Sequence, residues 1–133
     1  MSRRFADVRP GEELPELAID ITTTLIVAGA IASRDYYAVH HDHAFALRRG
    51  TPDVFTNILT TNGLVGRFVT DWAGPDATVK RIAIRLGVPN FPGDTMRLTG
   101  RVTAAERGVV EVAVAGRNRL GDHVTGTVTV GLP

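Results

Sequence analysis

The C-terminal half of the chain constrains the fold most, because it holds four apolar-rich segments separated by short connections. We expect strands at Thr78 to Val88, Asp94 to Ala104, Gly108 to Arg117 and Asp122 to Leu132. Two of the three connections contain Pro, Gly or Asn, which favour turns. Parallel strands need long crossovers, so strands joined this closely pair antiparallel. The sequence therefore predicts an antiparallel sheet.

A single long helix is expected to cover this sheet. Apolar residues from Val54 to Trp72 recur at helical spacing, after the start signal Thr51-Pro52-Asp53 and before the stop signal Gly74-Pro75. Farther upstream, Leu17 to Ala32 is rich in Ile, Thr, Val and Ala and is predicted as one long strand. These elements form an α+β layer pair, in which only the long helix can cover the apolar face of the sheet. A curved antiparallel sheet around one central helix is the hot-dog fold.

The remaining segments are short. Residues 1–13 carry several charges and few apolar side chains, so we expect a flexible N-terminal tail before a domain that spans residues 14–133. Asp42 is a typical helix cap and Gly50 a typical stop, and together they predict a short helix from His43 to Arg49.

Composition excludes several classes of function. A chain of 133 residues suits one domain with one active site. Its net charge of +1 gives no basic excess for nucleic acid. The longest apolar run, Thr24 to Ala32, is too short to span a membrane. Cysteine is absent, which excludes disulfides and thiolate chemistry. We therefore expect a cytoplasmic protein that binds neither nucleic acid nor membranes.

Asp35 and His40 are the residues most able to carry chemistry. They are five positions apart, so they can act together only if the residues between them form a turn rather than a regular helix. A carboxylate and an imidazole that share one water could add it across a double bond, one accepting a proton and the other donating one. By itself this spacing arises easily by chance, and a surface Asp beside a capping His is the simpler interpretation.

The surrounding motifs favour the catalytic interpretation. Asp35, His40 and Ala46 are spaced as in the MaoC-like or (R)-specific enoyl-CoA hydratase family, which the chain resembles from about Leu17 onward. The helical stretch 54–64 and the turn 89–95 resemble the same family. This resemblance implies that Asp35 and His40 are the catalytic pair, with the roles of base and acid left open. It also implies that a backbone N–H near Asn57 holds the thioester oxygen.

More specific strings resemble the branch of this family that hydrates steroid side-chain enoyl-CoA thioesters in cholesterol-type degradation. They include Asp53-Val54-Phe55, the segment 69–74 and Leu86-Gly87-Val88-Pro89. The resemblance implies an acyl-CoA substrate, no further cofactor, and a larger MaoC-like subunit in a heterodimer or heterotetramer. The chain also departs from the wider family: Arg34 and Asn57 stand where that family usually has Gly, and residues 36–39 lack its Asn-Pro turn.

The other histidines have simpler explanations than a metal site. His40, His41 and His43 are too close together to complete a tetrahedral site without a distant partner, and His123 is the only histidine left. We therefore expect no metal. Asp122 and His123 are interpreted as turn residues.

Two other functions remain open. A hot-dog acyl-CoA thioesterase would use a carboxylate on or just before the central helix, but no Asp or Glu lies between Val54 and Thr70, and Asp53 fits a helix cap. A non-catalytic partner subunit would merely complete a neighbour's pocket. The presence of both Asp35 and His40 favours the catalytic subunit.

Overall fold

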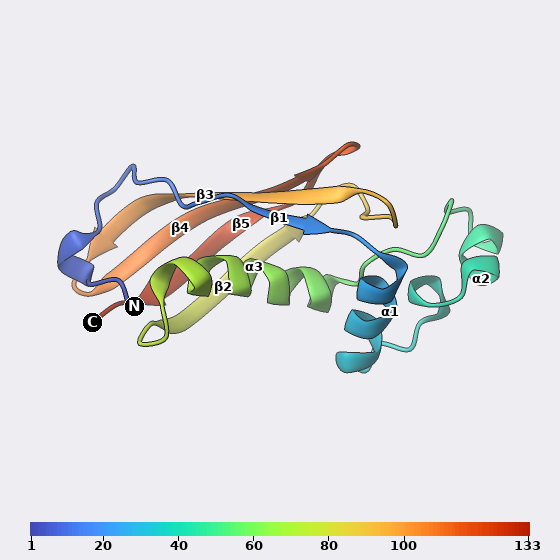
Figure 1. The fold of residues 1–133 in the computed structure, drawn as a ribbon, viewed down its shortest axis with the longest axis horizontal. Coiled ribbons are helices and arrows are strands. Elements are labelled where there is room, and N and C mark those ends of the chain that lie inside the picture. Colours follow the sequence, from blue (N-terminus) through green and yellow to red (C-terminus); the bar gives the residue numbers. More distant parts are fainter.

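The structure is a computed structural model that describes all 133 residues. Five antiparallel strands form one curved sheet in the order β1-β3-β4-β5-β2 (Figure 1). The strands are β1 (Leu17–Asp20), β2 (Thr78–Leu86), β3 (Thr95–Glu106), β4 (Val109–Asn118) and β5 (Gly121–Gly131). All four strands expected in the C-terminal half are present, with bounds within two residues of those predicted.

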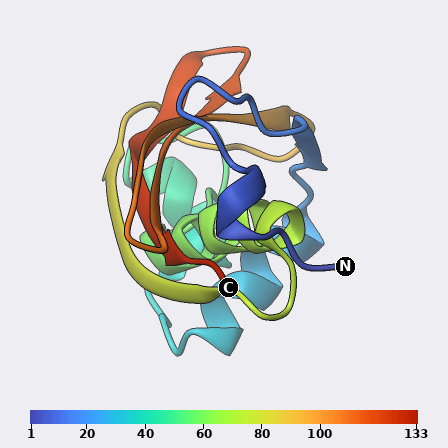
Figure 2. The ribbon, with the colours of Figure 1, turned by 90° about the vertical axis from the view of Figure 1, so that its left-hand side faces the viewer.

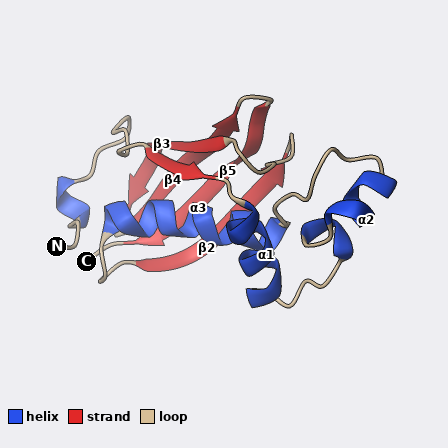
Figure 3. Ribbon diagram, turned by 45° about the vertical axis from the view of Figure 1, so that its right-hand side comes forward, coloured by secondary structure: helices blue, strands red, loops and turns tan.

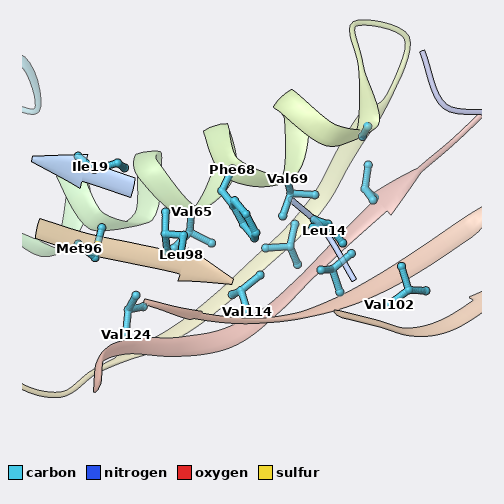
Figure 4. Close-up of a cluster of buried hydrophobic side chains, with 14 of the residues drawn as sticks. Leu14, Ile19, Val65, Phe68, Val69, Met96, Leu98, Val102, Val114 and Val124 are labelled. Carbon is cyan, nitrogen blue, oxygen red and sulfur yellow. The ribbon is translucent and has the colours of Figure 1, made fainter. Parts of the chain in front are cut away.

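Helix α3 (Ile58–Ala73) lies along the concave face of the sheet, which curves around it (Figures 1 and 2). Its buried side chains include Val65, Phe68 and Val69, which point toward the strands (Figure 4). Gly100 of β3 makes room for Phe68, because a Cβ there would lie 2.8 Å from the Phe68 ring. The α+β hot-dog prediction is therefore confirmed, and the core lies between α3 and the sheet.

The prediction that the central helix begins at Thr51 to Asp53 is wrong. Residues 51–57 are not helical, and α3 begins at Ile58 with Asn57 as its N-cap. The Asp53 carboxylate instead accepts hydrogen bonds from its neighbour's N–H at Val54 and from the His43 ring. Asp53 therefore stabilises the loop before α3 and does not cap the helix.

The prediction of one strand from Leu17 to Ala32 is also wrong. Strand β1 ends at Asp20, and helix α1 (Thr23–Ala32) follows. The Thr22 hydroxyl caps α1 by accepting a hydrogen bond from the Leu25 N–H at 3.0 Å. β-Branched residues disfavour a helix only weakly, so packing of α1 against α3 decides the structure here.

The N-terminal residues run along the sheet. A 3₁₀ turn, η1 (Phe5–Asp7), precedes Val8, which is buried in the core. The Phe5 N–H donates to the Pro133 carbonyl at 2.8 Å, and the Gly11 N–H donates to the Val102 carbonyl at 2.7 Å. This segment therefore has a defined position on the domain, while its expected mobility stays a prediction.

The region that holds the candidate site lies beyond one end of the sheet (Figure 3). Helix α1 leads into the 3₁₀ turn η2 (Ala38–His40) and then into α2 (His43–Arg48), which begins after the Asp42 cap as predicted. The N-terminus of α3 points toward α1 (Figures 1 and 3). No helix in the structure has the length and apolar character needed to cross a bilayer.

Candidate active site

Asp35 and His40 face each other across the loop between α1 and α2. The Asp35 Oδ2 and His40 Nε2 atoms are 3.5 Å apart. The His40 side chain is only 9% exposed, whereas that of Asp35 is 29% exposed. Their spacing allows this contact because residues 38–40 form a 3₁₀ turn rather than a continuation of α1. The structure thus brings together the two residues singled out in the sequence.

Asp35 owes its position to the way α1 ends. The Asp35 N–H donates to the Ala30 carbonyl at 2.9 Å, and the Arg34 N–H donates to the Ile31 carbonyl at 3.0 Å. This is the hydrogen-bond pattern of a Schellman motif, whose penultimate residue takes a left-handed conformation. Arg34 is that residue, with a φ of 56°. The motif turns the chain sharply at Arg34, so Asp35 is held against the C-terminal end of α1.

The orientation of His40 is fixed by its other ring nitrogen. Nδ1 lies 2.7 Å from the Phe55 carbonyl oxygen. A carbonyl only accepts, so Nδ1 carries a hydrogen and the neutral ring presents a lone pair at Nε2. The Phe55 ring packs edge-on against the imidazole, with centroids 5.0 Å apart. His40 therefore directs Nε2 toward Asp35.

Two donors hold the Asp35 carboxylate. The Tyr37 N–H donates to Oδ1 at 3.2 Å, and the Asn57 side-chain amide donates to Oδ2 at 3.1 Å. The hydrogen bond from Asn57 is the main reason why the pKa of Asp35 is lowered from 3.8, aided by Tyr37 and the charge of His40 against an opposing desolvation effect. Asp35 is therefore ionised at neutral pH.

The N-terminus of α3 adjoins the pair. The Asn57 side-chain oxygen accepts a hydrogen bond from the Thr60 N–H at 3.0 Å and caps the helix. The backbone N–H groups of Asn57, Ile58 and Leu59 have no acceptor within the chain. Asn57 is almost fully buried, whereas Ile58 and Leu59 are about half exposed. These free N–H groups offer donors to an anionic oxygen.

The chain does not enclose this site by itself. None of its five principal cavities is lined by Asp35 or His40. Several large apolar side chains from the same end of the molecule are exposed: Ile31, Tyr36, Tyr37, Leu47, Ile58 and Leu59. A shallow, open depression of about 650 Å³ lies along the outer face of α1 and is lined by Val27, Ala28 and Ile31 among others. The pair therefore lies at an open surface bordered by apolar groups.

The other histidines serve separate purposes. His43 Nδ1 lies 2.8 Å from Asp53 Oδ1, which lowers the pKa of Asp53, and His41 is exposed. The interpretation of His123 as a turn residue is wrong, because it lies in β5 and is 2% exposed. Its Nε2 contacts the Thr61 hydroxyl at 2.8 Å, so it joins the sheet to α3.

Sequence reasoning missed two contributors to the site. Ser33, the C-cap of α1, accepts a hydrogen bond from the Asn57 amide at 2.9 Å, and the same amide reaches Asp35. Asn57 was considered only for its backbone N–H. Its preference for helix N-caps was the available signal for a structural role of the side chain.

These features define a class, namely hot-dog domains with a carboxylate–imidazole pair beside the N-terminus of the central helix. The chain belongs to the MaoC-like domain family, whose model matches residues 6–124.

Named relatives are similar over nearly the whole chain. The 3-oxo-4,17-pregnadiene-20-carboxyl-CoA hydratase beta subunit of Mycobacterium tuberculosis is 52% identical over 122 residues, which cover 92% of this chain and 95% of that subunit. A chain in the crystal structure of the ChsH1–ChsH2 complex from the same species has a TM-score of 0.92 and 50% identity, and the match covers 94% of this chain and 98% of that one. The (R)-hydratase from A. caviae has a TM-score of 0.87 at 21% identity, covering 96% and 98%, and shares the fold.

Proposed function

We propose that this chain is the catalytic subunit of an enoyl-CoA hydratase that acts on a steroid side-chain thioester. The observation that carries this proposal is the Asp35–His40 pair, with 3.5 Å between Oδ2 and Nε2, in a chain that is 52% identical to a named hydratase subunit. In the substrate named for that relative, a double bond begins at C17 and the thioester is attached at C20. Addition of water at the β-carbon, C17, gives a tertiary alcohol on the ring.

The pair is arranged to hold one water molecule. The Asp35 carboxylate and the lone pair on His40 Nε2 both accept hydrogen bonds, so in the neutral tautomer they cannot bond to each other. A water molecule that donates to both satisfies both acceptors. Its oxygen is then free to attack the β-carbon, while its two hydrogens are held by the pair.

His40 is the better proton acceptor of the two. Hydrogen bonds from Asn57 and Tyr37 stabilise the ionised form of Asp35 and lower its pKa, which weakens it as a base. The Phe55 carbonyl accepts the Nδ1 hydrogen of His40 and stabilises the imidazolium that forms. In the proposed step His40 takes one proton from water, the hydroxyl bonds to the β-carbon, and the imidazolium returns a proton to the α-carbon.

The thioester oxygen must be stabilised as the α-carbon gains charge. Backbone N–H groups near Asn57, at the positive end of α3, are free to donate to it. Conjugate addition to a thioester develops an enolate-like oxyanion, and donors placed before the reaction stabilise it most. This supports the assignment of the region near Asn57 to substrate binding.

A second subunit is part of the proposal. The open site, its apolar border and the apolar face of α1 favour a larger MaoC-like partner that completes the steroid pocket, as the ChsH1–ChsH2 complex of the relative suggests. A helix that is apolar on all sides is normally buried, yet only Ile26 and Ala30 of α1 are buried within this chain.

The test is hydration of the named enoyl-CoA by the chain assembled with such a partner, with the product identified by mass. Asp35→Asn and His40→Ala should each lower kcat about 100-fold or more, since single acid–base groups commonly contribute that much. His41→Ala, an exposed neighbour, is the matched control and should retain kcat. Wild-type hydration by either variant in an assembled complex would overturn the catalytic pair. Release of free CoA without hydration would favour a thioesterase instead.

A further inference from the structure

The side chain of Asn57 makes four hydrogen bonds although the residue is only 2% exposed. Nδ2 donates to Asp35 Oδ2 at 3.1 Å and to Ser33 Oγ at 2.9 Å. Oδ1 accepts from the Thr60 N–H at 3.0 Å and from the Thr60 hydroxyl at 2.5 Å. A primary amide has two donor hydrogens and two acceptor lone pairs, so every hydrogen-bonding position of this side chain is used.

The orientation of the amide is determined by its partners. The Thr60 backbone N–H can only donate, so the atom facing it must be the oxygen, Oδ1. The nitrogen therefore faces Ser33 and Asp35. The Ser33 hydroxyl donates to the Gly29 carbonyl at 2.7 Å, which leaves its oxygen lone pairs for the Asn57 amide. Each donor thus meets an acceptor.

Asn57 connects two helix ends. Ser33 is the C-cap of α1, and Asn57 is the N-cap of α3. Asp35 follows Ser33 by two residues, so the Asn57 amide donates hydrogen bonds both to the end of α1 and to the carboxylate beyond it. The free N–H groups that begin α3 lie next to the same residue. The Asn57 side chain therefore links the Asp35 carboxylate directly to the start of α3.

We propose that Asn57 is a positioning residue for the hydration. Its side-chain amide holds the Asp35 carboxylate in the correct position relative to His40 and to the N-terminus of α3. This inference rests on the proposed function and adds a role for Asn57 distinct from its backbone N–H. Capping α3 requires only an acceptor oxygen, which Ser, Thr or Asp would supply as well. The two amide hydrogens have no part in the cap, and both go to the segment that carries Asp35.

The consequence for Asp35 concerns both geometry and charge. Oδ2 is the carboxylate oxygen nearest to His40, and it is the one that accepts from Asn57. One of its lone-pair directions is thereby occupied, which limits the directions from which a shared water can approach. The same hydrogen bond favours the ionised carboxylate, in agreement with the lowered pKa of Asp35.

The decisive variants keep the helix cap and remove the amide hydrogens. Asn57→Ser and Asn57→Asp both retain a capping oxygen, so circular dichroism should show that α3 still forms, although Asn57→Asp places a second carboxylate beside Asp35 and should lower the stability more than Asn57→Ser. In the complex with its partner, each should lower kcat for the enoyl-CoA on the order of 10- to 100-fold, because a misplaced reacting group loses rate rather than binding. KM should stay within about twofold.

A second measurement reports on Asp35 directly. Titration of the ¹³C-labelled Asp35 carboxyl by NMR in the full chain should give a higher pKa in Asn57→Ser than in the wild type, and a still higher one in Asn57→Asp, where a second carboxylate faces the first. Thr22→Ala removes the cap of α1, which does not touch the site, and is the matched control for loss of a cap. It should leave kcat and the Asp35 pKa unchanged.

The outcomes separate this inference from the proposed function. If Asp35→Asn abolishes hydration while Asn57→Ser keeps the wild-type kcat and Asp35 pKa, Asn57 is only a helix cap and the inference fails. If Asp35→Asn remains active, the proposed function fails whatever Asn57 does. Should the Asn57 variants lose their circular dichroism signal, Ser33→Ala removes one acceptor of the amide and leaves the cap of α3 intact. It should lower kcat in the same direction, and an unchanged kcat would overturn the inference.

Discussion

Replacing His123 by Phe should destabilise the domain by about 2–4 kcal/mol, although the two rings are similar in size. His123 Nδ1 lies 2.6 Å from the Val88 carbonyl oxygen, and Nε2 lies 2.8 Å from the Thr61 hydroxyl. The carbonyl only accepts, so the neutral ring donates from Nδ1 and accepts at Nε2 from Thr61. Phe removes both interactions and leaves their partners in place.

The size of this destabilisation depends on whether the Val88 carbonyl and the Thr61 hydroxyl can form other hydrogen bonds in the variant. A buried polar group left without a hydrogen bond costs about 1–3 kcal/mol. The Val88 carbonyl has no other donor in the chain and bears the full cost. The Thr61 hydroxyl is fully buried, but it can turn to the carbonyl of Asn57 four residues earlier, which reduces its cost. The two contributions add to about 2–4 kcal/mol.

Urea unfolding of the full chain, followed by circular dichroism at neutral pH, measures this loss. Adding Thr61→Val to His123→Phe should recover about 1 kcal/mol, because the orphaned hydroxyl is removed together with its former partner. His41→Phe, at an exposed position, should change the unfolding free energy by less than about 0.5 kcal/mol. A change equally small for His123→Phe would refute the reasoning.

Three further expectations concern stability and can be measured by thermal or urea unfolding of the full chain. Gly29→Ala should cost about 1–3 kcal/mol, because a Cβ there would lie 2.2 Å from the Thr60 hydroxyl oxygen, and a cost below about 0.5 kcal/mol would contradict that close contact. Gly63→Ala, inside α3 with no heavy atom within 4 Å of the new Cβ, should instead stabilise by about 1 kcal/mol, and destabilisation would show that the space is not open. Burial lowers the pKa of His123 below 6.5, so its contribution is present above that pH and is lost as the pH falls, by at most about 1.4 kcal/mol per pH unit. This part of the acid sensitivity should be missing in His123→Phe.

The C-terminal sheet could be predicted because its signals are local and agree with one another. Valine occupies every second position over 110–114 in β4 and over 128–130 in β5, and the connection between β2 and β3 contains two prolines and two glycines. Each strand pairs with a neighbour in register over most of its length. Period, composition and turn chemistry therefore give the same answer.

Helix α1 could not be predicted in this way because its composition indicates a strand. Thr22, Thr23 and Thr24 are β-branched, and so are three of the apolar residues that follow. The helix depends on a tertiary contact, in which the absence of a side chain at Gly29 admits Thr60 of α3. That contact joins residues 31 positions apart, and no local pattern contains it.

The start of α3 shows how a correct signal can be assigned to the wrong element. Pro52 and Asp53 form a typical helix start, yet the Asp53 carboxylate bonds to the Val54 N–H and the His43 ring instead. This holds residues 51–57 in a loop that presents the Phe55 carbonyl to His40. The displaced start is therefore needed for the site, because a helix from Thr51 would use that carbonyl within its own ladder.

Arg34 shows why a departure from the family pattern need not disturb the site. A non-glycine residue in the left-handed conformation costs roughly 1 kcal/mol, which explains why the related family favours Gly at this place. Here the backbone N–H groups of Arg34 and Asp35 donate hydrogen bonds to the last turn of α1, and the Asn57 amide donates one to Ser33. Together these hydrogen bonds fix the conformation of the turn at Arg34. A strained residue persists where its surroundings fix it in this way. The turn that presents Asp35 therefore depends on the capping network around residue 34 more than on the identity of its side chain.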